Sequence, residues 1–263
     1  MKISKNASIF LRLFIIPGFL LIILFLIIKA PDWVNTLLNK EQGNAPPVSS
    51  FGIVMPKGYT VHGIDISKHQ GVIDWKRVNK MKENGIQISF TFIKATEGIT
   101  RQDDKYEINW KQSGQNDILR GAYHFYYPSR DANKQADNFI KVVKLSKGDL
   151  PPVVDIEYSN GKSAKKISDD LMVFIKRLEK QYGVKPILYT NTNFYNTFLI
   201  GKFDEYPLWI AGYFDHERFY NEFTTPWILW QHSEKGKVDG IRGNVDFNVF
   251  KGSREKLQSM CLK

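Results

Sequence analysis

The sequence predicts an α/β domain: a modified TIM-type barrel of eight strands and about five helices, preceded by an N-terminal hydrophobic helix. Strand and helix patterns alternate from about residue 61 to residue 200, which is typical of parallel strands joined by right-handed crossovers. The rhythm then shortens, because three strand patterns share residues 207–250 and a βα unit needs roughly 30 residues. Polar side chains also gather where the predicted strands end. A doubly wound open sheet is the alternative, but no glycine-rich phosphate loop follows any predicted strand.

Each element is predicted from its own pattern. The strands are apolar or alternating runs, and the helices carry apolar residues at a spacing of three or four. Asp74 and Asp131 are expected to cap the start of two helices, and Gly183 to end a third. The expected helices are residues 74–84, 103–115, 131–145 and 163–183, with a short one from Asn193. The expected strands are residues 59–67, 88–96, 119–128, 150–157, 185–191, 207–213, 226–233 and 243–250.

The first sixty residues differ in kind from the rest. Leu13–Ile28 carries no charge, and three basic residues precede it. This pattern predicts a membrane anchor in residues 1–29 that contacts inner-membrane lipid, and the alternative is a cleaved signal peptide. Residues 30–60 collect Pro, Gly, Asn and Ser without periodicity and are expected to be a linker. The barrel, residues 61–263, would then lie in the cell envelope outside the cytoplasmic membrane, or be secreted if the segment is cleaved.

Composition narrows the functional classes. The net charge is +10, but the basic residues form no cluster, whereas nucleic-acid sites gather Lys and Arg on one stripe. Cys261 is the single cysteine, so no internal disulfide can form, and we expect a frayed terminal thiol. The histidines are scattered and show no zinc-binding spacing. We therefore expect no metal, no cofactor and no nucleic-acid partner, and a monomer.

The candidate site residues lie near the predicted strand ends. In a barrel of this kind the chemistry sits at the carboxyl ends of the strands. Aromatic residues at such positions can stack on sugars, although any one of them can equally be a core residue. The candidates, in chain order, are Asp65, His124, Tyr126, Asp155, Glu157, Tyr189, Trp209, Gln231 and Asp246.

Asp155 and Glu157 are the most informative pair. They end the apolar run "LPPVVDIE" at i and i+2, so their side chains project to the same face of a strand. Two carboxyl groups in one buried site raise at least one pKa, and a carboxyl that stays protonated near neutrality can act as a general acid. Cleavage of a glycosidic bond needs such an acid at the leaving oxygen. A structural ion pair is the alternative interpretation.

The chain resembles family 25 glycoside hydrolases, which are lysozymes of the N-acetylmuramidase type. The resemblance spans about residues 61–250 and rests on the order of seven motifs. Those motifs are "HGIDISKHQGVIDW", "FTFIKATEG", "RGAYHFYYP", "PPVVDIE", "PILYTN", "LWIAGY" and "WILWQHSEKGKVDGIRGNVDFNVF". The first motif departs from the family pattern, because His69 stands where an aromatic residue often lies.

The resemblance implies roles for the acidic residues. Glu157 would be the general acid/base, and Asp155 would orient the 2-acetamido group of N-acetylmuramic acid in a substrate-assisted reaction. Asp65 and Asp246 would tune the charge and hold the sugar or a water molecule. The implied fold is a barrel of eight strands and five helices, and the implied substrate is the glycan strand of peptidoglycan. Two alternatives stay open, a non-catalytic glycan-binding barrel and a chitinase-like hydrolase.

Overall fold

The computed structural model describes residues 48–213 and 215–263. The predicted anchor and most of the predicted linker lie outside these residues. Within them, no helix combines the length and the apolar composition that crossing a bilayer requires. The helix α7, Ala164–Tyr182, has 19 residues, and five of its first seven are charged or carry a hydroxyl group.

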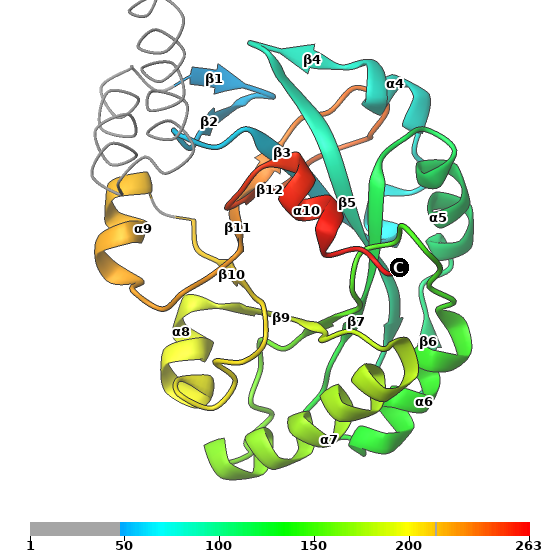
Figure 1. The fold of residues 1–263 in the computed structure, drawn as a ribbon, viewed down its shortest axis with the longest axis vertical. Coiled ribbons are helices and arrows are strands. Elements are labelled where there is room, and N and C mark those ends of the chain that lie inside the picture. The colour runs from blue at the N-terminus through cyan, green and yellow to red at the C-terminus, as the bar shows by residue number, and fades with distance from the viewer. Residues whose placement is uncertain (1–47, 214) are drawn as a thin grey trace, which may run out of the picture. The chain divides into compact units, whose positions relative to one another are not determined.

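The predicted eight-stranded closed barrel is confirmed for the described residues (Figure 1). The sheet runs in the order β3-β12-β11-β10-β9-β8-β7-β5, and β5 pairs again with β3 to close it. The open-sheet alternative is therefore wrong. The barrel strands are β3 (Val61–Ile66), β5 (Ile86–Glu97), β7 (Leu119–Phe125), β8 (Val153–Asp155), β9 (Ile187–Asn191), β10 (Leu208–Ala211), β11 (Leu229–Gly236) and β12 (Val245–Phe250).

One strand of the barrel runs against the others. β12 pairs antiparallel with both β11 and β3, while the other barrel pairings are parallel. A short antiparallel connection needs no crossover helix, which explains why β12 follows β11 so closely in the sequence. The beginning of β12 consequently lies beside the ends of its neighbours, and Asp246 is in register with Asp65.

The helices other than α10 lie around the outside of the barrel (Figure 1). Asp74 and Asp131 accept hydrogen bonds from the first helical turn as predicted, and Gly183 ends α7 in the left-handed conformation with φ of 70°. The helix predicted for 74–84 is shorter than expected. The remaining helices are α4 (Trp75–Lys80), α5 (Tyr106–Gly114), α6 (Ala132–Val142), α8 (Thr192–Phe194) with a π turn at Tyr195–Leu199, α9 (His216–Glu222), α10 (Arg254–Ser259) and the 3-10 turn Lys68–Gln70.

The sequence signal that ends α4 early is Asn84-Gly85. Both residues have positive φ, 50° and 82°, as a two-residue type I′ hairpin turn requires. The turn joins β4 (Lys82–Glu83) to β5 in antiparallel pairing. The predicted helix therefore stops at Lys80: Met81 caps its end, and the last three predicted positions belong to this hairpin.

A second hairpin occupies part of the predicted linker. β1 (Val48–Ser50) pairs antiparallel with β2 (Ile53–Met55). Phe51 at its turn is 1% exposed and its ring packs 5.0 Å from that of Phe247. The hairpin thus belongs to the packed domain, although the Gly and Ser content of this segment predicted a linker.

Alternation along the strands separates two apolar layers. Val154 and Ile156 are fully buried between the sheet and helices such as α7, whereas Val153 belongs to the cluster inside the barrel. Glycines make room for large rings inside: a Cβ on Gly63 would lie 2.4 Å from the Phe90 ring. Both layers are close-packed, which fixes where the strand ends point.

α10 closes the amino-terminal end of the barrel. Leu257 is fully buried in the interior cluster, and Cys261 is 9% exposed in the same cluster. The backbone N–H of Leu262 donates to Asp149 O at 2.9 Å, and Gly148 N–H donates to Leu262 O at 2.9 Å. The expectation of a frayed terminal thiol is therefore wrong.

The closure of the barrel by α10 gives a stability prediction. Leu257→Ala should lower the free energy of unfolding by about 2–4 kcal/mol, because it leaves a cavity at the barrel end. Urea unfolding followed by circular dichroism measures the change. Gln258→Ala, on the exposed face of the same helix, should change stability by less than about 0.5 kcal/mol. Equal effects of the two substitutions would contradict this role of α10.

Candidate active site

A cavity of about 240 Å³ lies at the carboxyl ends of the parallel strands. Seven of the nine sequence candidates line it, and the antiparallel β12 brings Asp246 to the same end. The lining residues are Asp65, Ser67, His69, Lys94, Tyr123, Phe125, Asp155, Glu157, Tyr189, Trp209, Tyr213, Gln231, Glu234 and Asp246.

Asp65, at the end of β3, is held by two buried amides. Its Oδ2 accepts from Gln231 Nε2 at 2.9 Å and from Asn248 Nδ2 at 2.7 Å. Asp65 is only 7% exposed and both amide side chains are buried. Hydrogen bonds to a carboxylate favour its charged form, so these donors oppose the effect of burial.

Aromatic donors fix the orientation of those amides. Gln231 Oε1 accepts from the hydroxyl groups of Tyr189, at 2.9 Å, and Tyr213, at 2.7 Å. Asn248 Oδ1 accepts from Trp209 Nε1 at 2.8 Å. Because each amide oxygen is engaged by a group that donates, each amide nitrogen must point toward Asp65. The three aromatic residues therefore position a buried negative charge, and Tyr189 and Trp209 are not simply core residues.

Asp65 and Asp246 behave as a coupled pair. Burial raises the pKa of both carboxyl groups, and the hydrogen bond between them places the proton on Asp246. The two amide donors and the Asp246 hydroxyl favour the ionised form of Asp65. Among the described residues no amide donates to Asp246, and the negative charge of Asp65 raises the pKa of Asp246 further. The pair consequently holds one negative charge, on Asp65.

Asp155 and Glu157 form the second carboxyl pair. Asp155 ends β8, and Ile156 N–H still donates to Tyr189 O at 3.0 Å, so the chain stays extended and both side chains face the cavity. Burial raises the pKa of both groups, and the charge of Glu157 raises that of Asp155. The two carboxyl groups are hydrogen-bonded to one another. Because these pKa values are raised, this pair also keeps a proton at a pH where an exposed carboxylic acid has lost it.

Lys94 supplies positive charge beside this second pair. Its ammonium lies 2.7 Å from Glu97 Oε2 and 4.7 Å from the centre of the Phe125 ring. Its charge opposes the rise in the pKa of Asp155 and of Glu157. Lys94 lies near the end of β5 in the motif "FTFIKATEG", but nothing in its local pattern indicates that it faces the carboxyl pair.

The structure does not bring His124 and Tyr126 into the cavity. Both are buried on the outer face of the barrel, where their rings pack on Phe174 of α7 at 5.0 and 5.3 Å. Side chains alternate along β7, so Tyr123 and Phe125 face the cavity instead. Burial lowers the pKa of His124 to about 3, which keeps its ring neutral. The residues of β7 that face the cavity are each one position before the two that the sequence analysis selected.

Asn248 is a site residue that sequence reasoning missed. It follows Asp246 at i+2 in β12 and is fully buried. The spacing that identified Asp155 and Glu157 applies to Asp246 and Asn248 as well. The difference is that an amide carries no charge, so nothing marks it as unusual in an apolar strand.

The chain matches the sequence model described as glycosyl hydrolases family 25 over residues 64–241. The chain belongs to glycosyl hydrolase family 25. It is 48% identical to the Escherichia coli K12 protein YegX over 213 residues, 81% of this chain and 78% of that one. It is 32% identical to Lysozyme M1 of Streptomyces globisporus over 241 residues, 87% of this chain and 80% of that one.

Solved structures agree with this assignment. A family 25 glycosyl hydrolase from Bacillus anthracis superposes with a TM-score of 0.67 at 31% identity, covering 76% of this chain and 93% of that one. A bacterial lysozyme from Streptomyces coelicolor gives 0.67 at 31% identity, covering 78% and 98%. The family 25 chain is therefore a glycoside hydrolase. The residues matched by the family model include Asp65, Asp155 and Glu157. They end before β12, so Asp246 and Asn248 lie outside the match.

The coupled pair of this family 25 enzyme gives a prediction for pH. The pKa of Asp246 is raised in the folded state, so the folded chain binds more protons than the unfolded chain above about pH 4. Stability then falls as pH rises from there toward the folded pKa. Asp246→Asn keeps a neutral donor to Asp65, so its stability relative to the natural chain should increase between pH 5 and pH 8.

Urea unfolding at pH 5 and at pH 8 measures that difference. Asp239→Asn is a matched control, because Asp239 forms an exposed ion pair with Arg77 far from the cavity. A stability difference between Asp246→Asn and the natural chain that stays constant over this range would contradict the shared proton.

Proposed function

We propose that the chain is a peptidoglycan muramidase that hydrolyses the β-1,4 bond between N-acetylmuramic acid and N-acetylglucosamine. The observation that carries the proposal is the carboxyl pair at the barrel mouth of a family 25 chain, formed by the buried Asp155 and the partly buried Glu157. Relatives and similar structures named as lysozymes and muramidases support the choice of substrate.

Glu157 serves as the general acid in the proposed first step. It gives its proton to the glycosidic oxygen while the acetamido oxygen of the same N-acetylmuramic acid attacks the anomeric carbon. The bond to the leaving sugar breaks and an oxazolinium ion forms. In the second step Glu157 takes a proton from water, and the water oxygen attacks the anomeric carbon. The oxazolinium ring opens, which restores the acetamido group, and the configuration at the anomeric carbon is retained overall. Glu157 therefore ends the cycle protonated.

Asp155 binds and orients the acetamido group in the proposed mechanism. Its Oδ1 is buried and accepts no hydrogen bond from any residue in the described ranges, so it can accept the acetamido N–H. That bond would favour the ionised form of Asp155 and move the shared proton to Glu157. Lys94 assists, because its charge favours the ionised form of whichever carboxyl loses the proton.

The spacing of the carboxyl groups favours this route over a nucleophilic carboxylate. Retaining glycosidases with such a nucleophile separate the two carboxyl groups by about 5–5.5 Å, and inverting enzymes separate them further. Asp155 and Glu157 interact directly with one another, a closer arrangement than that of an acid and a nucleophile on either side of a sugar carbon. Asp65, ionised and held by Gln231 and Asn248, provides the fixed negative charge that favours the positive anomeric centre.

Substitution of the general acid tests the function. Glu157→Gln should lower kcat by about 10²–10⁴-fold, because the glycosidic oxygen loses its proton donor. Reducing ends released from defined peptidoglycan, with mass spectrometry of the fragments, measure both the rate and the bond cleaved. Tyr158→Phe changes the neighbouring exposed residue and serves as a matched control.

The outcomes separate the alternatives. Turnover retained in Glu157→Gln would contradict the assignment of the acid. Binding of peptidoglycan by the natural chain without release of reducing ends would indicate a non-catalytic glycan-binding barrel. Faster cleavage of chitin oligomers than of peptidoglycan would indicate a chitinase-like hydrolase.

The proposal also covers where the protein is located in the cell. Leu13–Ile28 is uncharged and follows three basic residues, which supports an uncleaved membrane anchor with the barrel outside the cytoplasmic membrane. The full chain should remain in the membrane fraction after washing with alkaline carbonate and be released by detergent. A mature N-terminus at or after Ala30, determined by mass spectrometry, would contradict the anchor and favour secretion.

A further inference from the structure

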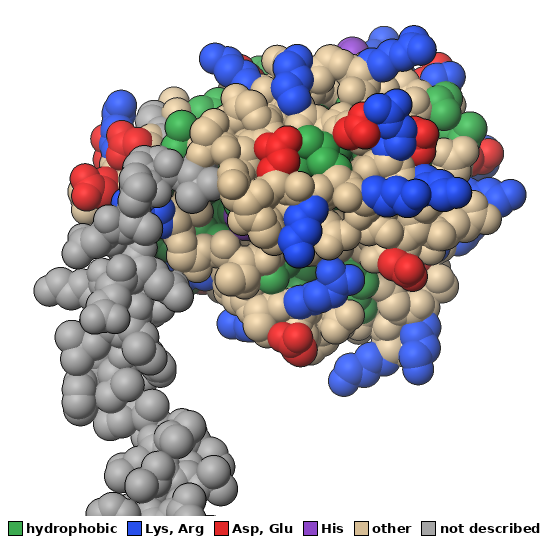
Figure 2. Space-filling model, turned by 90° about the horizontal axis from the view of Figure 1, so that it is seen from above, with side chains coloured by type: hydrophobic (Ala, Val, Ile, Leu, Met, Phe, Trp, Pro, Cys, Tyr) green, Lys and Arg blue, Asp and Glu red, His purple; other side chains and the backbone are tan. Residues whose placement is uncertain are grey.

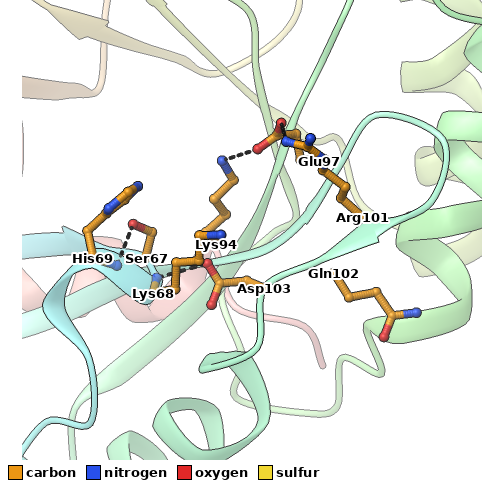
Figure 3. Close-up of a pocket in the computed structure, with 8 residues that line it drawn as sticks. All are labelled: Ser67, Lys68, His69, Lys94, Glu97, Arg101, Gln102 and Asp103. Carbon is orange, nitrogen blue, oxygen red and sulfur yellow. Dashed lines mark hydrogen bonds and ion pairs between the residues drawn. The ribbon is translucent and has the colours of Figure 1, made fainter.

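A second cavity opens beside the catalytic one. Its volume is about 530 Å³, and it shares Ser67, His69 and Lys94 with the catalytic cavity (Figure 3). A ligand seated in the catalytic cavity can therefore continue into the second one. Its remaining lining residues come from the 3-10 turn after β3 and from the β5–β6 hairpin, where β6 is Arg101–Gln102.

The charge of the lining changes between the two cavities. The catalytic cavity holds five carboxyl groups and one lysine. The second cavity holds Lys68, Lys94 and Arg101 against two carboxylates, Glu97 and Asp103. Lysine and arginine bind an anionic group more strongly than a neutral sugar hydroxyl, because the hydrogen bonds are then charge-assisted on both sides, so this lining fits an anionic group. On the face shown in Figure 2, Lys and Arg side chains of the described residues are interspersed with acidic ones and form no continuous stripe.

Both carboxylates of the second cavity are already engaged. Glu97 accepts from Lys94 at 2.7 Å, Arg101 at 3.2 Å and the Tyr127 hydroxyl at 2.9 Å. Asp103 is 9% exposed and accepts the backbone N–H of Lys68 at 2.8 Å. Figure 3 shows Asp103 directed at the turn that carries Lys68. This bond holds the Lys68 turn at the cavity rim, while the Lys68 ammonium forms no ion pair with any described residue.

We propose that the second cavity binds the carboxylates of the peptide stem that N-acetylmuramic acid carries in peptidoglycan. The inference rests on the proposed muramidase function and adds a substrate requirement to it. N-Acetylmuramic acid differs from the other sugar of the strand by a lactyl ether, to which a short peptide with free carboxylates is joined. A stem on the sugar that occupies the catalytic cavity can enter the second cavity past Lys94 and meet Lys68 and Arg101.

A third cavity, of about 510 Å³, provides an internal control. It shares Glu97 and Arg101 with the second cavity but no lining residue with the catalytic one. Arg130 lines only this third cavity, and Lys68 lines only the second. Both side chains are exposed. Reversal of either charge therefore changes the net charge equally, but only Lys68 lies on the proposed path of the stem.

The test compares Lys68→Glu with Arg130→Glu on three soluble muropeptide glycans. The first carries stems with free carboxylates, the second the same stems with the carboxylates amidated, and the third no stem. Lys68→Glu should raise KM about fivefold on the first glycan only, with kcat unchanged, because an exposed charge contact is modest. Arg130→Glu should leave KM unchanged on all three. The Lys68→Glu effect should shrink at high salt.

Equilibrium binding of the same glycans to Glu157→Gln, with and without Lys68→Glu, gives a readout that does not require turnover. A fivefold weaker Kd confined to the free-carboxylate glycan supports the inference even if no glycan is cleaved, an outcome that would overturn the muramidase function alone. Equal effects of Lys68→Glu on the free and amidated stems, or equal effects of Lys68→Glu and Arg130→Glu, would overturn the inference.

Discussion

The pairing of β3 with β12 closes the barrel and assembles one half of the site in the same step. Because the two strands are antiparallel and in register at Asp65 and Asp246, closure places two carboxyl groups side by side in a buried position. Burial of an unpaired charge is very costly, so the surrounding residues must compensate for at least one charge. The hydrogen-bond network of the cavity follows from this constraint.

The compensation is built from neutral donors. Gln231 and Asn248 stabilise the charge of Asp65 without neutralising it, and Trp209 fixes one of these amides in turn. An arginine in their place would cancel the negative charge that a positive anomeric centre requires. On the other side of the cavity, burial keeps a proton on the pair of Asp155 and Glu157. One site therefore holds a carboxylate and a carboxylic acid at the same pH, as glycosidic cleavage demands.

Much of this arrangement could be predicted from local patterns. The caps at Asp74 and Asp131, the left-handed Gly183 and the division of "LPPVVDIE" between two faces all depend on neighbours within a few residues. The errors have equally local causes. Asn84-Gly85 was a readable hairpin signal that shortened a helix. His124 and Tyr126 were assigned to the wrong face, because alternation along β7 does not by itself reveal which set of positions faces inward.

By itself the sequence determined the eight-stranded barrel, the same-face pairing of Asp155 with Glu157 and, through its ordered motifs, the family. Only the tertiary structure decided that β12 runs antiparallel, which brings Asp246 to the barrel mouth although it lies near the start of its strand. Likewise it alone revealed Lys94 beside the carboxyl pair and Asn248 beneath Asp65. The physical reason is that alternation along a strand is a local property, whereas strand direction and register are set by pairing between segments far apart in the chain.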